Sequence, residues 1–163
     1  MPVIQELLNA NLHYAQTFQK GHLALPPARK IAVVVCMDAR IDPAEALGLQ
    51  EGDAHVIRNA GGRISDALRS LAISQTLLGT EEVAIIHHTD CGMLTFSDES
   101  IRAQLRKERR IDADAVAFLP FKDLDTSVRD DLTAYRASPL VRQDVPVRGF
   151  VYDVKTGQLR EVA

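Results

Sequence analysis

The chain has no tryptophan, and only 5% of its 163 residues are aromatic, so we expect a core built from aliphatic side chains. It also lacks a basic excess: 19 lysines and arginines against 22 aspartates and glutamates give a formal net charge of −3, which argues against nucleic acid as a partner. No apolar run approaches the roughly 18 residues that a membrane-spanning helix needs, so no membrane partner is expected. The first residues have neither the charged start nor the apolar stretch of a signal peptide, and we therefore expect a cytoplasmic location.

Cysteine is scarce as well, and both copies, Cys36 and Cys91, stand close behind runs of hydrophobic residues, 31–35 and 83–86. In a reducing compartment, paired cysteines bind metal or do chemistry more often than they form disulfides. The rest of the composition, 46% hydrophobic, suits one globular domain that spans residues 1–163.

The hydrophobic pattern predicts an α/β fold with a central, mostly parallel sheet flanked by helices. Residues 31–35 and 83–86 are apolar on both alternating faces, as in strands covered on both sides, and residues 54–58 are a further strand candidate. Before the third strand we expect a helix with Ser65 as its N-cap and Gly79 as its end. Two strands followed by a helix and a strand are typical of a parallel sheet.

Other elements follow from the same kind of pattern. Apolar residues at helical spacing predict an amphipathic helix over residues 4–18. The helix after Ser65 is expected to bury Leu68, Leu71, Ala72 and Leu78. A polar helix is expected from Ser97 and a further helix over residues 125–137, with a loop between them. Residues 149–154 and 158–162 predict a C-terminal hairpin at the edge of the sheet.

Three residues stand out as a candidate metal site: Cys36, His88 and Cys91. Ligands of an open parallel sheet gather beyond the carboxyl ends of its strands, and these residues follow two such strands. Two thiolates and an imidazole suit zinc and leave one tetrahedral position for water or substrate, as in catalytic sites. The His-x-x-Cys pair alone is a weak signal, and two inert buried cysteines beside an ordinary histidine are the alternative.

Asp38 and Arg40 extend this hypothesis. Residues two apart in an extended segment point the same way, so both side chains would project alongside Cys36. An aspartate there is either a fourth metal ligand or the acceptor for a proton on metal-bound water. Arg40 can hold the carboxylate with two hydrogen bonds and lower its pKa. An ordinary surface ion pair is the alternative.

At this point the sequence resembles a known family, the β-class carbonic anhydrases, and in particular a short bacterial-type member. Three blocks carry the resemblance in the same order and spacing: Cys36-x-Asp38-x-Arg40, then Arg58-Asn59-Ala60-Gly61, then His88-x-x-Cys91-Gly92. The likeness covers residues 30–95 and continues more weakly through the C-terminal hairpin.

The resemblance implies that Cys36, His88 and Cys91 bind Zn²⁺ and that zinc-bound hydroxide converts CO₂ to bicarbonate and a proton. It assigns the hydrogen bond from the hydroxide to Asp38, with Arg40 holding Asp38 ionised. In a closed state of the family, Asp38 would itself be the fourth zinc ligand. Because two thiolates donate more charge than imidazoles, we expect an activity that rises toward alkaline pH. For proton export, His87, His55, His22 and His13 are candidates by residue type alone.

The chain also departs from the family. Val33 and Val35 replace a tryptophan and a glycine that form an inhibitory bicarbonate pocket in some relatives, so we expect the open form. Pro27 stands where many relatives have a glutamine that touches the substrate. The family's sites lie at a dimer interface, which implies a homodimer or a tetramer with the helix of residues 4–18 as an interface arm.

Other functions remain open at this stage. Hydrolases of carbonyl sulfide or carbon disulfide share the fold and the ligand set, and only the shape of the pocket separates them from carbonic anhydrases. A zinc protein closed permanently by Asp38 is a second alternative, and a thiol protein without metal is a third.

Overall fold

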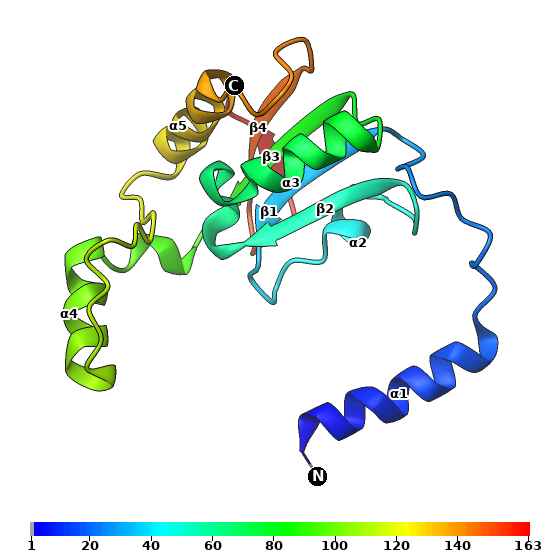
Figure 1. The fold of residues 1–163 in the computed structure, drawn as a ribbon, viewed down its shortest axis with the longest axis horizontal. Coiled ribbons are helices and arrows are strands. Elements are labelled where there is room, and N and C mark those ends of the chain that lie inside the picture. Colours follow the sequence, from blue (N-terminus) through cyan, green and yellow to red (C-terminus); the bar gives the residue numbers. More distant parts are fainter. Residues whose placement is uncertain (1) are drawn as a thin grey trace.

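In the computed structural model, which describes residues 2–163, one five-stranded sheet organises the chain (Figure 1). The strand order is β2-β1-β3-β4-β5, with β1 to β4 parallel and β5 antiparallel to β4. The strands are β1 (Ile31–Cys36), β2 (Ala54–Asn59), β3 (Glu82–His88), β4 (Val147–Tyr152) and β5 (Leu159–Glu161). This confirms the predicted α/β fold with its C-terminal edge hairpin.

Helices cover the two faces of the sheet unequally. The helices α3 (Ile64–Leu77) and α5 (Leu124–Ala137) pack on one face, where Val34 and Ile85 lie in the main aliphatic core. Val33 belongs to a second core on the opposite face, where the only helix of the described residues is the five-residue α2 (Pro43–Leu47). Successive strand residues thus face opposite cores, as their apolar pattern on both faces predicts.

Two helices stand away from the sheet (Figure 1). The helix α1 (Val3–Thr17) confirms the predicted amphipathic helix, but it buries none of its residues. The polar helix α4 (Asp98–Arg109) begins after Ser97, which caps it by accepting a hydrogen bond from the Ser100 amide, and it too buries no residue. Among residues 2–163, no helix has the length and apolar character needed to cross a membrane.

Two local predictions were wrong. Ser65 is not an N-cap: α3 already begins at Ile64, whose amide donates to the distant carboxylate of Asp131 at 3.1 Å. The buried stripe of α3 also differs from the prediction, since of the four expected residues only Leu71 is fully buried. The observed stripe consists of Ile64, Ala67, Leu71, Ser74 and Gln75.

The turn between β2 and α3 fits its surroundings only because it is made of glycine. Gly62 has φ +69°, and a Cβ atom there would lie 3.0 Å from the Cys36 amide nitrogen and 3.0 Å from the Ile86 carbonyl oxygen. The turn therefore lies directly against the ends of β1 and β3. Any side chain at this position would press on the backbone that carries Cys36.

We expect Gly62→Ala to destabilise the fold more than Gly79→Ala. Both glycines have positive φ. A Cβ atom at Gly79 would meet nothing within 4 Å, so alanine there loses only the free energy needed to hold a left-handed backbone, about 1–2 kcal/mol. At Gly62 a steric cost of about 1–3 kcal/mol adds to it. Urea unfolding of both variants measures the difference, and equal losses of unfolding free energy would contradict this account of the turn.

Candidate metal centre

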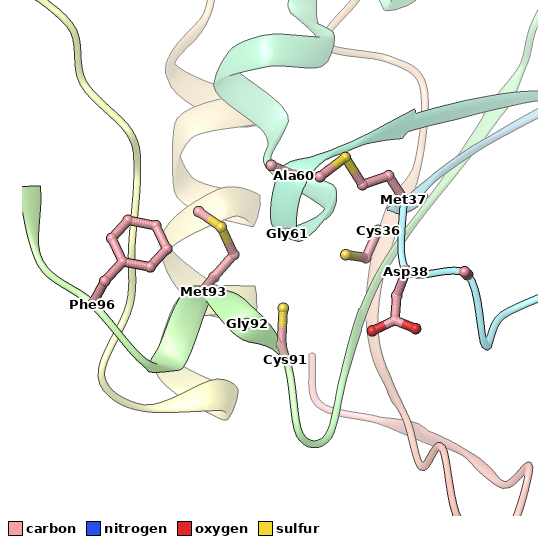
Figure 2. Close-up of a pocket in the computed structure, with 10 residues that line it drawn as sticks. Cys36, Met37, Asp38, Ala60, Gly61, Cys91, Gly92, Met93 and Phe96 are labelled. Carbon is pink, nitrogen blue, oxygen red and sulfur yellow. The ribbon is translucent and has the colours of Figure 1, made fainter. Parts of the chain in front are cut away.

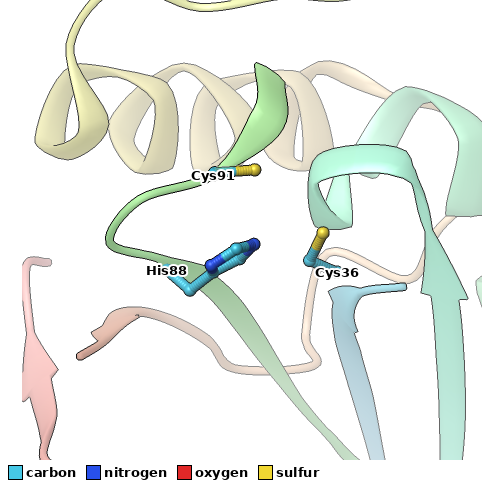
Figure 3. Close-up of side chains that lie close together, drawn as sticks. All are labelled: Cys36, His88 and Cys91. Atoms are coloured by element: carbon cyan, nitrogen blue, oxygen red, sulfur yellow. The ribbon is translucent and has the colours of Figure 1, made fainter. Parts of the chain in front are cut away.

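Three potential metal ligands meet at the carboxyl edge of the sheet (Figure 3). Cys36 is the last residue of β1 and His88 the last residue of β3, and these strands are parallel neighbours. Cys91 follows three residues later, just before a short 3₁₀ turn over Gly92–Leu94. The two sulfur atoms and a ring nitrogen of His88 all lie within 4.8 Å of one another, and all three residues are buried.

His88 is oriented as a metal-binding histidine requires. Its Nδ1 lies 2.9 Å from the Thr89 carbonyl oxygen, to which it donates, so the lone pair is on Nε2. Nε2 is buried and has no hydrogen-bond partner among the described residues. A buried nitrogen without a partner is costly. A metal ion bound to Nε2 would remove that cost, and the fixed Nδ1 would hold the ring in place.

The two thiols are electrostatically coupled. A hydrogen bond from the Cys91 thiol lowers the pKa of Cys36 below its ordinary value, and a smaller contribution comes from His88. The same contact with Cys36, together with burial, raises the pKa of Cys91. These opposite shifts favour a thiolate on Cys36, and metal binding would require that both thiols lose their protons. Two thiolates and one imidazole form a donor set that suits Zn²⁺ and leaves one position open.

Asp38 lies beside this cluster and is clamped by Arg40. The guanidinium donates from Nε to Asp38 Oδ1 at 3.0 Å and from Nη2 to Oδ2 at 2.8 Å, and the Arg40 amide adds a bond of 2.9 Å to Oδ1. These bonds hold the pKa of Asp38 well below its usual range, so the carboxylate is ionised. Asp38 Oδ2 is 3.8 Å from His88 Nε2, which places the anion next to the ligand nitrogen.

The second sequence block supports the backbone of the first. From β2, Arg58 donates to the carbonyl oxygens of Cys36 at 3.2 Å and of Asp38 at 2.7 Å, so it fixes both residues from behind. Asn59 exchanges hydrogen bonds of 2.8 and 2.7 Å with the backbone of Arg63 and so closes the glycine turn. Neither side chain lines the pocket beside the cluster, so we assign both a supporting role.

A pocket of about 480 Å³ opens beside the cluster (Figure 2). Cys36, Asp38 and Cys91 face it, while Met93 and Phe96 contribute to a mostly apolar wall. The pocket thus brings an ionised carboxylate and two sulfur atoms together with a surface that suits a small apolar molecule.

The other histidines of the β-sheet do not face this pocket. His87 is fully buried and contacts Ser127 at 2.7 Å and Asp131 at 3.0 Å, both on α5. His55 pairs with Ala32 near the opposite end of β1 from the cluster. From the sequence, Asp90 is predicted to be a cap or a supporting hydrogen-bond acceptor without a catalytic role, and in the structure its Oδ2 accepts a 2.7 Å hydrogen bond from Arg40 Nη1. Its place beside Cys91 was the one available signal.

Comparisons with known proteins agree with this geometry. A family model described as carbonic anhydrase matches residues 31–159. The chain is 47% identical to beta-carbonic anhydrase 1 of Mycobacterium tuberculosis, with 99% of each chain covered. The crystal structure of a carbonic anhydrase from Streptococcus mutans superposes with a TM-score of 0.95 at 44% identity, covering 100% of this chain and 99% of that one. A carbon disulfide hydrolase of Acidithiobacillus thiooxidans is 35% identical over 86% of this chain and 81% of its own.

We expect the protein to bind one Zn²⁺ or Co²⁺ per chain through the cluster. Cys36→Ser and His88→Ala should each weaken that affinity by at least about 100-fold, more than the loss of a supporting residue costs. His55→Gln, a matched change at the other end of the sheet, should leave it unaltered. Titration with Co²⁺, followed by the thiolate charge-transfer absorption, measures all three variants. Undiminished binding by both ligand variants would exclude this site.

Proposed function

The chain belongs to the β-carbonic anhydrase family, and from this premise we propose which residues carry its reaction, the reversible hydration of CO₂ to bicarbonate and a proton. Zn²⁺ is the proposed cofactor, held by Cys36, His88 and Cys91. When bound, it would supply an activated water molecule at neutral to alkaline pH. The observation that carries the assignment is the ionised Asp38 carboxylate, fixed beside a cluster with only three protein ligands.

Asp38 is proposed as the residue that orients the attacking water. Arg40 lowers the pKa of Asp38, so the carboxylate is ionised and can only accept hydrogen bonds. It would orient a water molecule in the pocket by accepting a hydrogen bond from it. Arg40 keeps that carboxylate in place before the substrate arrives, which lowers the cost of reaching the transition state. The apolar wall at Met93 and Phe96 would receive CO₂, which is small and carries no charge.

The released proton has a direct route to solvent. Of the histidines among residues 2–163, only His88 belongs to the cluster, and none of the others lines the pocket. Met37, which lines the pocket, is 64% exposed in the single chain and gives this side of the pocket contact with solvent. We propose that the proton passes to water and buffer without a histidine relay.

Carbon disulfide hydrolysis is the less favoured activity. The chain is 47% identical to the mycobacterial carbonic anhydrase over nearly its full length, against 35% or less for the carbon disulfide hydrolases. The three ligands alone do not separate the two reactions, because the same metal can activate water for attack on either carbon. CO₂ is therefore the proposed substrate, and carbon disulfide serves as the comparison in the test.

We expect Asp38→Asn to lower kcat/KM for CO₂ by about 100-fold or more, because the amide cannot replace an ionised acceptor. Its metal content should stay at the wild-type level, and Asp66→Asn, an exposed change in the first turn of α3, should leave the activity unaltered. Stopped-flow hydration assays at a fixed pH, paired with metal analysis, test this.

The same assays on the wild type should show activity that rises between about pH 7 and 9, because two thiolates make zinc a weaker acid than three imidazoles do. Asp38 is ionised throughout this range, so it does not set the slope. A protein that binds zinc but hydrates no CO₂ at any of these pH values would indicate a permanently closed site. Faster turnover of carbon disulfide than of CO₂ would favour the hydrolase.

We further propose that the protein is a homodimer and that α1 is its interface arm. The large apolar residues of α1, and Phe18, which follows it, are all at least 48% exposed. Such an exposed apolar stripe is unfavourable in water and indicates a contact with another protein surface. Those that form the apolar stripe are Ile4, Leu7, Leu8, Leu12 and Phe18. Tyr14 and Lys20 both contact Glu51, which fixes the direction in which the helix leaves the body.

We also propose that residues 1–163 form one domain and act in the cytoplasm, where the free thiols of Cys36 and Cys91 are preserved.

We expect Leu8→Asp to shift the protein from dimer toward monomer, because it places a charge in the centre of the apolar stripe of α1. Asn9→Asp adds the same charge to the polar side of the helix, where Asn9 already accepts a hydrogen bond from Gln5, and should leave the dimer intact. Light scattering coupled to size-exclusion chromatography measures both masses. If Leu8→Asp and Asn9→Asp have the same mass in solution, α1 is not the interface arm of the dimer.

A further inference from the structure

Arg40 is held from two sides, and the proposed reaction uses only one of them. Besides its two side-chain bonds to Asp38, the guanidinium donates from Nη1 to Asp90 Oδ2 at 2.7 Å and from Nη2 to the Asp90 carbonyl oxygen at 2.9 Å. The Arg40 side chain is 47% exposed, so packing alone does not fix it. It bridges two carboxylates of which only Asp38 faces the pocket.

Asp90 is itself carried by an anchored loop. The Thr89 amide donates to the Tyr152 carbonyl oxygen at 2.9 Å, and the Thr89 hydroxyl accepts from the Val154 amide at 3.1 Å, so the end of β4 holds the loop. Cys91 follows immediately and is buried. Asp90 has φ +56°, which turns the chain sharply between these two fixed points. Its carboxylate therefore has a defined position from which to hold Arg40.

An arginine side chain at the surface loses much of its rotamer freedom when it is confined to one geometry. With Asp38 as its only partner, Arg40 would exchange between the clamp and other exposed conformations. Two further hydrogen bonds to the loop of Asp90 fix the plane of the guanidinium, so that its Nε and Nη2 edge faces Asp38. The clamp is thus built before any water or substrate is oriented.

We propose that Asp90 is a positioning residue that holds Arg40 against Asp38 and thereby keeps Asp38 from turning onto the metal. The proposal rests on the function assigned above to Asp38 and Arg40. Asp38 Oδ2 already lies 3.8 Å from His88 Nε2, so a carboxylate released by Arg40 has little distance to travel to become a ligand. Loss of the Asp90 carboxylate shifts Asp38 toward that closed arrangement.

Asp90 could also serve only the backbone, because aspartate is one of the few residues that tolerate positive φ. In that case a glycine at this position would leave the activity unchanged. Two substitutions separate the roles. Asp90→Gly keeps the left-handed backbone and the carbonyl acceptor but removes the carboxylate. Asp90→Asn keeps the backbone and leaves a side-chain oxygen that can accept from Arg40 Nη1.

The experiment measures kcat for CO₂ and the azide affinity of the Co²⁺-loaded protein, since azide binds only where the fourth metal position is exchangeable. We expect Asp90→Gly to lower both by about 10-fold, the range typical of residues that support a metal site, with unchanged metal content. Asp90→Asn should restore both to within about threefold of the wild type. Wild-type values in Asp90→Gly, or equal losses in Asp90→Gly and Asp90→Asn, would overturn the proposal.

A double-mutant cycle tests whether Asp90 acts through Asp38. In the Asp38→Asn background, Asp90→Gly should have no further effect on kcat, because the group that it positions is already neutral. If the losses of kcat from Asp38→Asn and Asp90→Gly add in the double variant, Asp90 does not act through Asp38 and the proposal is overturned. If the wild type is inactive or Asp38→Asn is fully active, the proposed function itself fails. An active wild type, an impaired Asp38→Asn and an unaffected Asp90→Gly reject the role of Asp90 alone.

Discussion

The parallel pairing of β1 with β3 is the constraint on which the candidate metal centre depends. Parallel neighbours end at the same edge of a sheet, so Cys36 and His88 meet there although they are far apart in the sequence. The strands are held side by side by apolar residues that alternate between two cores. Gly62 adds the close approach of the next turn, because it lets that backbone lie against both strand ends. The positions of Cys36 and His88 are therefore set by the sheet, while Cys91 comes from the loop that follows β3.

A buried carboxylate ties the same strand end to two helices. Asp131 on α5 is 1% exposed and accepts from the Ile64 amide, from His87 Nε2 and from Arg63 Nη2, each at 3.0 to 3.1 Å. A buried anion is tolerated only when it is fully compensated, so these three contacts must form together. They connect the start of α3 and the residue just before His88 to α5. This explains how α3 begins without a side-chain cap from its own N-terminal residues and how the end of β3, which carries His88, is anchored to α5.

The sequence alone was sufficient for the sheet and for the identity of the cluster. Strands that are apolar on both faces have few other places in a fold, so β1 and β3 could be predicted from composition and length. Cysteine and histidine behind such strands predicted a candidate metal site. The pairing of Asp38 with Arg40 was also predicted, but for the wrong reason: the segment is not extended, and a turn in which the Ile41 amide donates to the Asp38 carbonyl oxygen brings the two side chains together. The five-residue α2 was missed because a helix of one turn is too short to show a periodic pattern.

Only the tertiary structure decided which distant groups complete these local features. Ser65 has the residue type of an N-cap, yet the helix already begins at Ile64, whose amide is bound by Asp131 from another helix. The sequence allowed Asp90 to be a cap or a supporting acceptor, but only the fold shows its partner, by bringing it within 2.7 Å of Arg40. The sequence determined the fold class and the residues of the candidate metal site, because those follow from local periodicity and side-chain chemistry. The partners of these residues depend on distances across the fold, and such distances exist only once the helices have packed.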